Sequence, residues 1–275
     1  MIHELEQDEF YKCKTLLNDI GHLEAKAVIE GNNPGRVFVD HLDAPKAGLI
    51  WLGNHDGFFF IGDDQSEVFL QEINDCMETT IIPEARQLNL TTFIAIGNHS
   101  RWDKTIETLF TDRDMHKFKQ HVYRLEHPKE QHHPPIKSEY HVIKISEALF
   151  NEQNYSITNK HFLQSKLAEF WASPNAFFDK GIGYGVVYQH QLVSLCFSGF
   201  VAGNVHGLDM ETMEDHQGNK LGQLAASSVV KECVHKGMVP YWDCEEANQA
   251  SNAIARKVGL ENFFSYNVYL FPIDS

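Results

Sequence analysis

Long hydrophobic runs are missing from this 275-residue sequence, and no stretch approaches the length that a membrane-spanning helix needs. The N-terminal residues 1–6 are acidic and lack the basic start and apolar core of a secretory signal peptide. The five cysteines are scattered without any C-x-x-C pair, which indicates reduced thiols, most of them small core residues. We therefore expect a cytoplasmic protein with no membrane partner.

Positive charge is also scarce. Lys and Arg number 23 against 38 Asp and Glu, which gives a formal net charge of −15. Such a balance argues against nucleic acid or anionic lipid as the main partner and is compatible with a cationic amine substrate. The hydrophobic content of 43% and the charged content of 22% are typical of a soluble globular protein. The length suits one large domain or two ordinary ones.

The first half of the chain alternates short strand-like and helix-like patterns. An amphipathic pattern predicts a helix over residues 4–20, and residues 53–56 are typical of a hairpin loop. Residues 128–135, which include His132-His133-Pro134-Pro135, are the best candidate for a linker. The other elements that we expect here are strands at 36–40, 47–52, 57–61, 92–96 and 118–125, and helices at 66–77 and 102–110.

Three segments of this half are similar to the metal-ligand motifs of calcineurin-like metallophosphoesterases: Gly53-Asn54-His55-Asp56, Gly62-Asp63-Asp64 and Gly97-Asn98-His99. Their order is wrong for that family, and Ser66 stands where the second motif needs an aspartate. Asn, Gly, His and Asp are also ordinary turn residues. We expect no metal, and a metallophosphoesterase is the third of the functional alternatives.

The second half contains the stretch on which the functional argument depends. A strand at 140–145, a helix from about Thr158 and strands at 181–188 and 191–200 lead to a strand at 205–213. A polar turn follows, and then a helix at 221–236 that Gly237 ends. Such a turn exposes backbone N–H groups, and the helix adds the positive end of its dipole. Strand, turn and helix in this order are suited to binding a pyrophosphate.

This stretch resembles the acetyl-CoA loop of the GNAT superfamily of acetyltransferases, whose pattern is Gln/Arg-x-x-Gly-x-Gly/Ala. Gln217 and Gly222 match the ends of the pattern. Downstream, a strand at 241–244, Asn248 and the pair Gly259-Leu260 match the superfamily's next strand, its helix with an asparagine and its closing pair. The second half as a whole is similar to a bacterial GNAT subgroup that has an extra N-terminal domain.

The resemblance implies that acetyl-CoA is the co-substrate. Backbone groups of Met210, Glu211 and Thr212 would pair with the pantetheine arm as an extra strand would. Asn248 would hydrogen-bond the pantetheine chain, with Ser251 about one turn further along the same helix. The pyrophosphate would lie in the turn, against Gln217, Gly218, Asn219, Lys220, Leu221 and Gly222.

Two positions depart from the family pattern. Lys220 replaces the first glycine of the loop, which is costly if the backbone there needs positive φ, although its ammonium could offset phosphate charge. Ala255 stands where many relatives place the tyrosine that protonates the leaving thiolate. Tyr241, Ser251 or water could serve instead, or the thiolate could leave unprotonated, and we assign no acid.

The base is expected on the strand at 205–213, because the attacking amine must lose a proton. Glu211, Asp209 and His206 are the candidates, and alternation places Asp209 and Glu211 on one face, opposite Met210. The resemblance puts Glu211 next to the thioester, so we favour Glu211 as the catalytic residue and expect a structural role for His206.

The fold class that we predict is α/β, with two GNAT-like domains in tandem, each a mixed, mostly antiparallel sheet flanked by helices. Residues 1–130 would form a degenerate copy, and residues 131–275 the acetyltransferase domain. The predicted function is an N-acetyltransferase that moves an acetyl group from acetyl-CoA to a small-molecule or peptide amine. The alternative is a CoA- or acyl-CoA-binding regulatory module without turnover, which Ala255 and Lys220 favour. The sequence leaves open whether the N-terminal half shapes the acceptor pocket, supports a homodimer or does neither.

Overall fold

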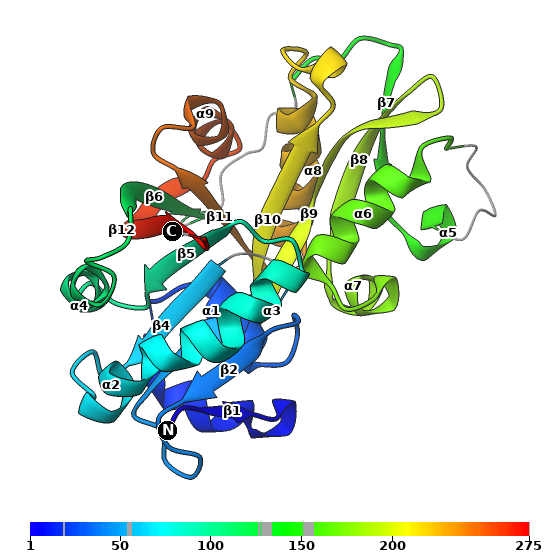
Figure 1. Ribbon diagram of the computed structural model, residues 1–275. Helices are drawn as coiled ribbons and strands as arrows, with labels where there is room; N and C mark the ends of the chain where they lie inside the picture. The colour runs from blue at the N-terminus through cyan, green and yellow to red at the C-terminus, as the bar shows by residue number, and fades with distance from the viewer. Residues whose placement is uncertain (19, 54–56, 126, 128–133, 151–156, 275) are drawn as a thin grey trace. The chain divides into compact units, whose positions relative to one another are not determined.

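The computed structural model describes residues 1–18, 20–53, 57–125, 127, 134–150 and 157–274. The chain divides into two compact units, one formed by Met1–Gln120 with Tyr266–Ser275 and the other by His121–Ser265. Each unit has helices packed on a mixed sheet, so the predicted α/β class is confirmed (Figure 1). The domain boundaries at 1–130 and 131–275 stay a prediction. The middle of the predicted hairpin loop, 54–56, and most of the predicted linker, 128–133, lie outside the described residues.

The first unit has the strand order β1-β2-β3-β4-β5-β12. β4 and β5 are parallel, whereas the other neighbouring strands whose register is known are antiparallel. β1 pairs with β2, so the helix predicted to begin at residue 4 begins later, as the 3-10 helix η1. The elements of this unit are β1 (His3–Leu5), η1 (Gln7–Leu16), α1 (Leu23–Ile29), β2 (Arg36–Val39), β3 (Ala47–Trp51), β4 (Gly57–Gly62), α2 (Glu67–Cys76), η2 (Met77–Ile81), α3 (Ile82–Gln87), β5 (Thr92–Gly97), α4 (Trp102–Leu109), most of β6 (His116–Arg124) and the end of β12 (Glu261–Pro272).

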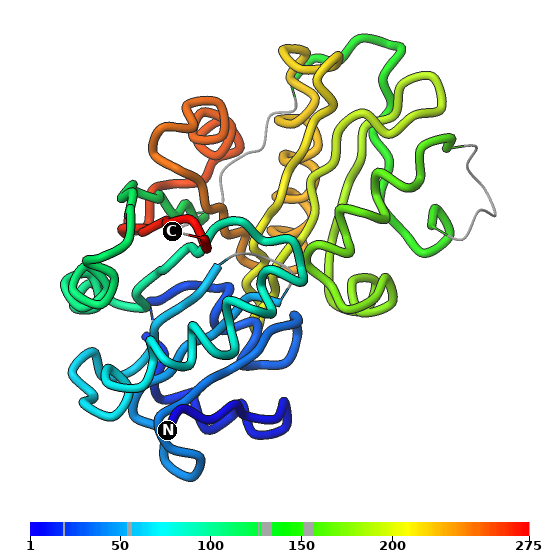
Figure 2. Tube along the Cα trace, in the orientation of Figure 1, coloured from blue at the N-terminus to red at the C-terminus, as the bar shows by residue number. Residues whose placement is uncertain are grey.

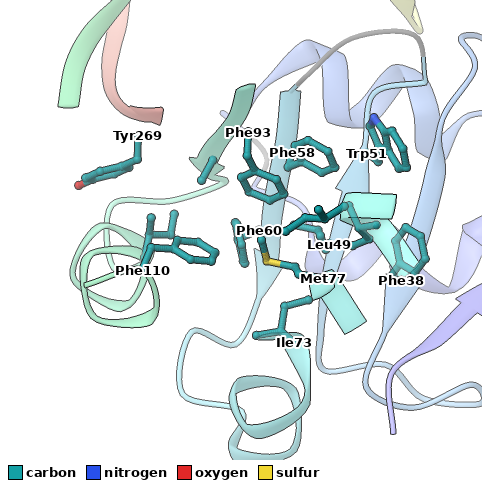
Figure 3. Packing of buried hydrophobic residues seen from close by; sticks show 14 of the residues in the cluster. Phe38, Leu49, Trp51, Phe58, Phe60, Ile73, Met77, Phe93, Phe110 and Tyr269 are labelled. Atoms are coloured by element: carbon teal, nitrogen blue, oxygen red, sulfur yellow. The ribbon is translucent and has the colours of Figure 1, made fainter. Parts of the chain in front are cut away.

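Aromatic side chains fill the core of this unit (Figure 3). The rings of Phe58 and Phe93 stack at 3.9 Å between centroids, and Phe271 of β12 stacks on Phe93 at 5.0 Å. Burying one such side chain stabilises the fold by roughly 1.5–3 kcal/mol. Because Phe271 is close to the end of the chain, the last residues complete the core of the first unit.

The second unit has the strand order β11-β10-β9-β8-β7, with the end of β6 beside β11, and helices cover this sheet on both faces. α8 packs on one face, with Val193 and Cys196 of β9 in its core. α6 and α7 pack on the opposite face, where the alternating β9 residues Leu195 and Phe197 point (Figure 1). The elements are β7 (Tyr140–Lys144), α5 (Glu147–Phe150), α6 (Lys160–Phe170), α7 (Pro174–Lys180), β8 (Gly183–Tyr188), β9 (Gln191–Ala202), β10 (Val205–Thr212), η3 (Glu214–His216), α8 (Leu221–His235), β11 (Val239–Glu245) and α9 (Gln249–Lys257), with the ends of β6 and β12.

The two units repeat one topology. In the first, β3 and β4 are antiparallel, α2 follows β4, and β5 returns parallel to β4 before α4. In the second, β9 and β10 are antiparallel, α8 follows β10, and β11 returns parallel to β10 before α9. β12 then leads the chain back to the first unit, where it pairs with β5 (Figure 2). Across the described residues, no helix is long and apolar enough to cross a membrane.

Candidate active site

A cavity of about 750 Å³ lies in the second unit, between β10, β11, α9 and the N-terminus of α8. β10 and β11 pair at only three positions, Val205↔Val239, His206↔Pro240 and Gly207↔Tyr241. At Gly207/Leu208 the pairing of β10 with β9 shifts register, and such a bulge bends a strand. Beyond it, β10 and β11 separate. The edge of β10 from Leu208 to Thr212 therefore faces the cavity instead of a neighbouring strand.

The turn after β10 presents backbone amides to this cavity. Gln217 N–H donates to Glu214 O, and Leu224 N–H donates to Lys220 O. Between those two, within the described part of the chain, the amides of 218–223 take part in no backbone hydrogen bond. Side chains hold the turn instead: Gln217 Nε2 donates to Thr212 O at 3.2 Å, and Asn219 Nδ2 donates to His216 O at 3.2 Å. The turn is thus fixed in shape while its amides remain available.

Lys220 adopts the left-handed conformation that the sequence argument associated with glycine, with φ 63° and ψ 18°. Gly218 also has positive φ, at 76°. A non-glycine residue in this region costs roughly 1–2 kcal/mol. Lys220 is also the N-cap of α8 and provides no side-chain cap. Lys220, where the family pattern has glycine, therefore has a strained backbone, and its ammonium group lies on the surface.

Gly222 is required by packing within the protein. A Cβ atom at this position would lie 2.6 Å from Met210 Sδ and 3.2 Å from Thr212 Oγ1. The first turn of α8 therefore lies directly against the side chains of β10. This close approach brings the amides of the turn to the end of the strand edge that β11 leaves unpaired.

The matching helix of the first unit, α2, provides an internal comparison. Its N-cap Ser66 accepts a hydrogen bond from Phe69 N–H, and Asp63 and Asp64 precede it. That N-terminus is capped by its own side chain and flanked by negative charge, which disfavours an anion. α8 has neither feature, so of the two repeats the second is the one suited to a pyrophosphate.

The structure brings ten of the eleven predicted cofactor-binding residues to the wall of one cavity: Met210, Glu211, Thr212, Gln217, Gly218, Lys220, Leu221, Gly222, Asn248 and Ser251. Asn219 is not part of that wall. Asn248 lies just before α9 as its N-cap, with Oδ1 accepting from Ser251 N–H at 3.0 Å. Ser251 Oγ accepts from Trp242 Nε1 at 2.9 Å, which orients the hydroxyl beside β11.

The three candidate bases on β10 have different surroundings. His206 is buried, and its Nδ1 lies 2.9 Å from Ser198 Oγ. Burial lowers the pKa of His206 to about 4, and the charge of Lys236 acts in the same direction. His206 is absent from the cavity wall, whereas Asp209 and Glu211 are part of it. A structural role for His206 is consistent with this position.

The structure also distinguishes the side chains that the sequence offered as the acid that protonates the leaving thiolate. Ala255 is fully buried in the core under α8, so its place in α9 faces the protein interior. Tyr241 does not line the cavity, but Ser251 does. Of the side chains considered, Ser251 is thus the hydroxyl that lines the site.

Several cavity residues escaped the sequence argument. His216 contacts Tyr140 OH through Nδ1 at 3.2 Å, and three further charged residues line the cavity: Asp243, Glu245 and Lys257. Lys166 of α6 reaches Glu211, with Nζ 2.6 Å from Oε2. Lys257 could have been predicted as a cavity residue, because its spacing from Ala250 and Ile254 places all three on one helix face. The pairing of Lys166 with Glu211 could not have been predicted, because 45 residues separate the two in sequence.

The metallophosphoesterase-like segments serve other contacts. His99 Nε2 lies 2.8 Å from Gly62 O, and Asp64 pairs with Arg101 at 3.0 Å. Asp40 Oδ2 accepts from Ser66 Oγ. Within the described residues, no group of three or more His, Cys, Asp or Glu side chains is arranged to hold a metal, and residues 54–56 lie outside them.

Comparison with known proteins identifies the family of this chain. The GNAT acetyltransferase family model matches residues 14–269. The uncharacterized N-acetyltransferase YdfB of Bacillus subtilis is 24% identical over 271 residues, which cover 98% of each protein.

Solved structures share the fold. A GCN5-related N-acetyltransferase-like protein from Streptococcus suis is similar at a TM-score of 0.67 and 18% identity, over 96% of this chain and 98% of that one. A tandem GNAT protein from the clavulanic acid biosynthesis pathway is similar at a TM-score of 0.62 and 10% identity, over 99% of each chain. The family model covers nearly the whole chain, and the fold agrees with it: this protein belongs to the GNAT acetyltransferase family.

Proposed function

We propose that this protein is an acetyl-CoA-dependent N-acetyltransferase whose donor site is the cavity between β10 and β11. The observation that carries the proposal is the set of amides at 218–223, which take part in no backbone hydrogen bond of the described chain and adjoin an unpaired strand edge. An anion at such a helix N-terminus gains both hydrogen bonds and the favourable end of the helix dipole. Membership of the GNAT acetyltransferase family supports the same assignment.

Each part of the donor has residues suited to it. The amides of Gly218 to Gly222 would hold the pyrophosphate, with Lys220 adding a positive charge. The backbone of Met210, Glu211 and Thr212 would pair with the amide groups of the pantetheine arm, as an added strand would. Asn248 and Ser251 line the opposite side, so their polar atoms would meet the arm from α9.

The reaction would require little more from the protein than position and one base. The donor supplies an activated acyl group as a thioester. A carboxylate of β10, Glu211 or Asp209, takes a proton from the bound ammonium, and the free amine then attacks the thioester carbonyl. A backbone N–H of the unpaired β10 edge can stabilise the charge that develops on the carbonyl oxygen. Four carboxylates line the cavity, which suits a cationic small-molecule or peptide amine: Asp209, Glu211, Asp243 and Glu245.

A CoA-binding module without turnover is the second candidate. The buried Ala255, which leaves the family's tyrosine hydroxyl absent, favours it. Release of free CoA thiol, measured across a panel of mono-, di- and polyamines and lysine-containing peptides, separates the two functions. We expect saturable release with at least one cationic amine. Tight CoA binding with no release above the background hydrolysis for any amine would leave the binding module as the better assignment.

Replacing Lys220 by glycine tests what the turn contributes. Because Lys220 has φ 63°, we expect Lys220→Gly to raise the free energy of unfolding by roughly 0.5–1 kcal/mol. Loss of an exposed charge should weaken CoA binding about three- to tenfold at low salt, and less in 0.5 M salt. Lys220→Gln is the matched control, with the same loss of affinity but no gain in stability. A loss above about 100-fold would show that the ammonium, and not the amides, holds the phosphates.

A further inference from the structure

Asp209 and Glu211 lie on the face of β10 that α6 covers. In the antiparallel register with β9, Asp209 is opposite Phe197 and Glu211 is opposite Leu195, and both of those β9 residues belong to the core under α6 and α7. Met210 points to the other face, toward α8. The predicted alternation is therefore present, and two carboxylates line the cavity from the same face.

The charge of Glu211 is already compensated. Lys166 Nζ lies 2.6 Å from Glu211 Oε2 and 2.9 Å from Glu169 Oε1, so one ammonium joins both carboxylates. Burial on its own would lower the pKa of Lys166, but its hydrogen bonds to Glu211 and Glu169 raise the pKa above the ordinary value. The Glu211 carboxylate is therefore already engaged in an ion pair within the protein. A carboxylate held in this way is less free to contact an acceptor amine.

Asp209 lies closer to the place where β10 and β11 part. The strands separate after Gly207, two residues before Asp209 and four before Glu211. At about 3.3 Å per residue, Asp209 is roughly 7 Å along the strand from that point and Glu211 about 13 Å. If the pyrophosphate is at the N-terminus of α8, beyond Thr212, the arm runs toward the point of separation. The acyl group at the end of the arm then comes nearer to Asp209.

The partly enclosed position of Asp209, more than the charges around it, favours a proton acceptor that works near neutral pH. Burial raises the pKa of Asp209 to about 6, Lys166 opposes this rise, and Glu169 and Glu211 add to it. On β9 the neighbouring ionisable group is Cys196, a buried thiol whose own pKa is raised by burial and by Asp209. On β11, Asp243 lines the same cavity. A base with a pKa close to the working pH is the most effective.

We infer that Asp209, rather than Glu211, accepts the proton of the acceptor ammonium, and that Lys166 holds the Glu211 side chain in place. The inference rests on the proposed function. In the step, the N–H bond of the ammonium breaks and its proton moves to an Asp209 carboxylate oxygen. The neutral nitrogen forms a bond to the acyl carbon, and the carbon–sulfur bond breaks with its electron pair leaving on the thiolate. The second amine proton goes to solvent or to the thiolate.

The test compares kcat/KM against pH for the full-length wild type, Asp209→Asn, Glu211→Gln and Asp209→Glu, with an amine that the wild type acetylates. Calorimetry with CoA and a thermal melt establish that each variant folds and binds the donor. We expect the wild type to rise in kcat/KM between pH 5 and 7, and Asp209→Asn to lose at least 100-fold in kcat/KM together with that rise. Asp209→Glu should restore part of the activity together with that rise.

Glu211→Gln is expected to lose less than tenfold and to keep the rise, moved to lower pH because a like charge beside Asp209 is gone. A folded Asp209→Asn variant with near-wild-type kcat/KM would overturn the inference. So would Glu211→Gln as the variant that loses the pH-dependent rise. A wild type that binds CoA but acetylates no amine would instead refute the proposed function, and the inference with it.

Discussion

Replacing Gly222 by valine is expected to abolish measurable CoA binding, a loss of affinity of at least about 100-fold, or roughly 2.7 kcal/mol. The new Cβ would lie 2.6 Å from Met210 Sδ, and the branches of valine add two further methyl groups at the start of α8. Either Met210 moves into the gap beside β11, or the first turn of α8 moves away from β10. The first change fills the gap that the donor would occupy, and the second moves the amides of the turn away from the unpaired strand edge. Calorimetric titration with CoA measures the effect directly.

The double variant Gly222→Val with Met210→Ala distinguishes a packing defect from a defect in the site. Removing the Met210 side chain relieves the shortest contact, so we expect the double variant to regain most of the melting temperature that the single variant loses. CoA affinity should remain low, because valine still covers the amides. If affinity returned together with stability, Gly222 would serve only the packing of α8.

Asp209→Asn is expected to stabilise the protein at pH 8 while it removes activity. The pKa of Asp209 is raised from an ordinary 3.8 to about 6, chiefly by burial. The folded state therefore holds this proton more tightly than the unfolded state does. The resulting stabilisation is complete below pH 3.8 and is lost between pH 3.8 and 6. Above pH 6 the native protein keeps a partly buried carboxylate ionised, at a cost of about 3 kcal/mol.

A neutral asparagine avoids that cost. We expect the free energy of unfolding of Asp209→Asn to exceed that of the wild type by about 2–3 kcal/mol at pH 8 and to match it near pH 4. Denaturant unfolding at both pH values measures the difference. Glu211→Gln is the matched control and should show no gain at pH 8, because it gives up the ion pair with Lys166. A less stable Asp209→Asn at pH 8 would mean that the carboxylate is a structural group.

The strand, turn and helix around Gly222 could be predicted because local chemistry determines them. Alternating residues in β10, a polar glycine-bearing turn and the glycine after α8 each indicate their own element. The three strands of the first hairpin region were found for the same reason, and β2, β3 and β4 confirm them. Where sequence period and turn residues agree, the fold follows from the sequence alone.

Elements that depend on tertiary packing were missed. The helical stretch from Met77 to Gln87 contains a π-helical turn and a proline, and Thr79-Thr80-Ile81-Ile82 is a β-branched run that disfavours helix locally. Ile81 and Ile82 are nevertheless buried in the core of the first unit, which overrides that preference. β12 was missed as well, because its partner β5 is far away in the sequence.

In the candidate site, too, local patterns could be recognised and features that depend on tertiary packing were missed. The loop residues were found from a pattern within six positions, but the conformation of Lys220 could not be, because lysine has no preference for positive φ. Glu211 was favoured because it is adjacent to the expected thioester. The ion pair between Glu211 and Lys166 depends on how α6 packs over β10, and no local sequence pattern predicts that packing.

We propose that the amides of Gly218 to Gly222 bind the diphosphate of a CoA thioester. Two-dimensional NMR of the full chain, labelled with ¹⁵N at its 18 glycines, tests it during a titration with CoA. Spectra of Gly218→Ala and Gly222→Ala identify the two resonances. We predict that both move downfield and saturate together, because each amide gains a charge-assisted hydrogen bond. If both stayed in place while glycines of the first unit, such as Gly62 and Gly97, shifted, CoA would bind elsewhere and the account would be wrong.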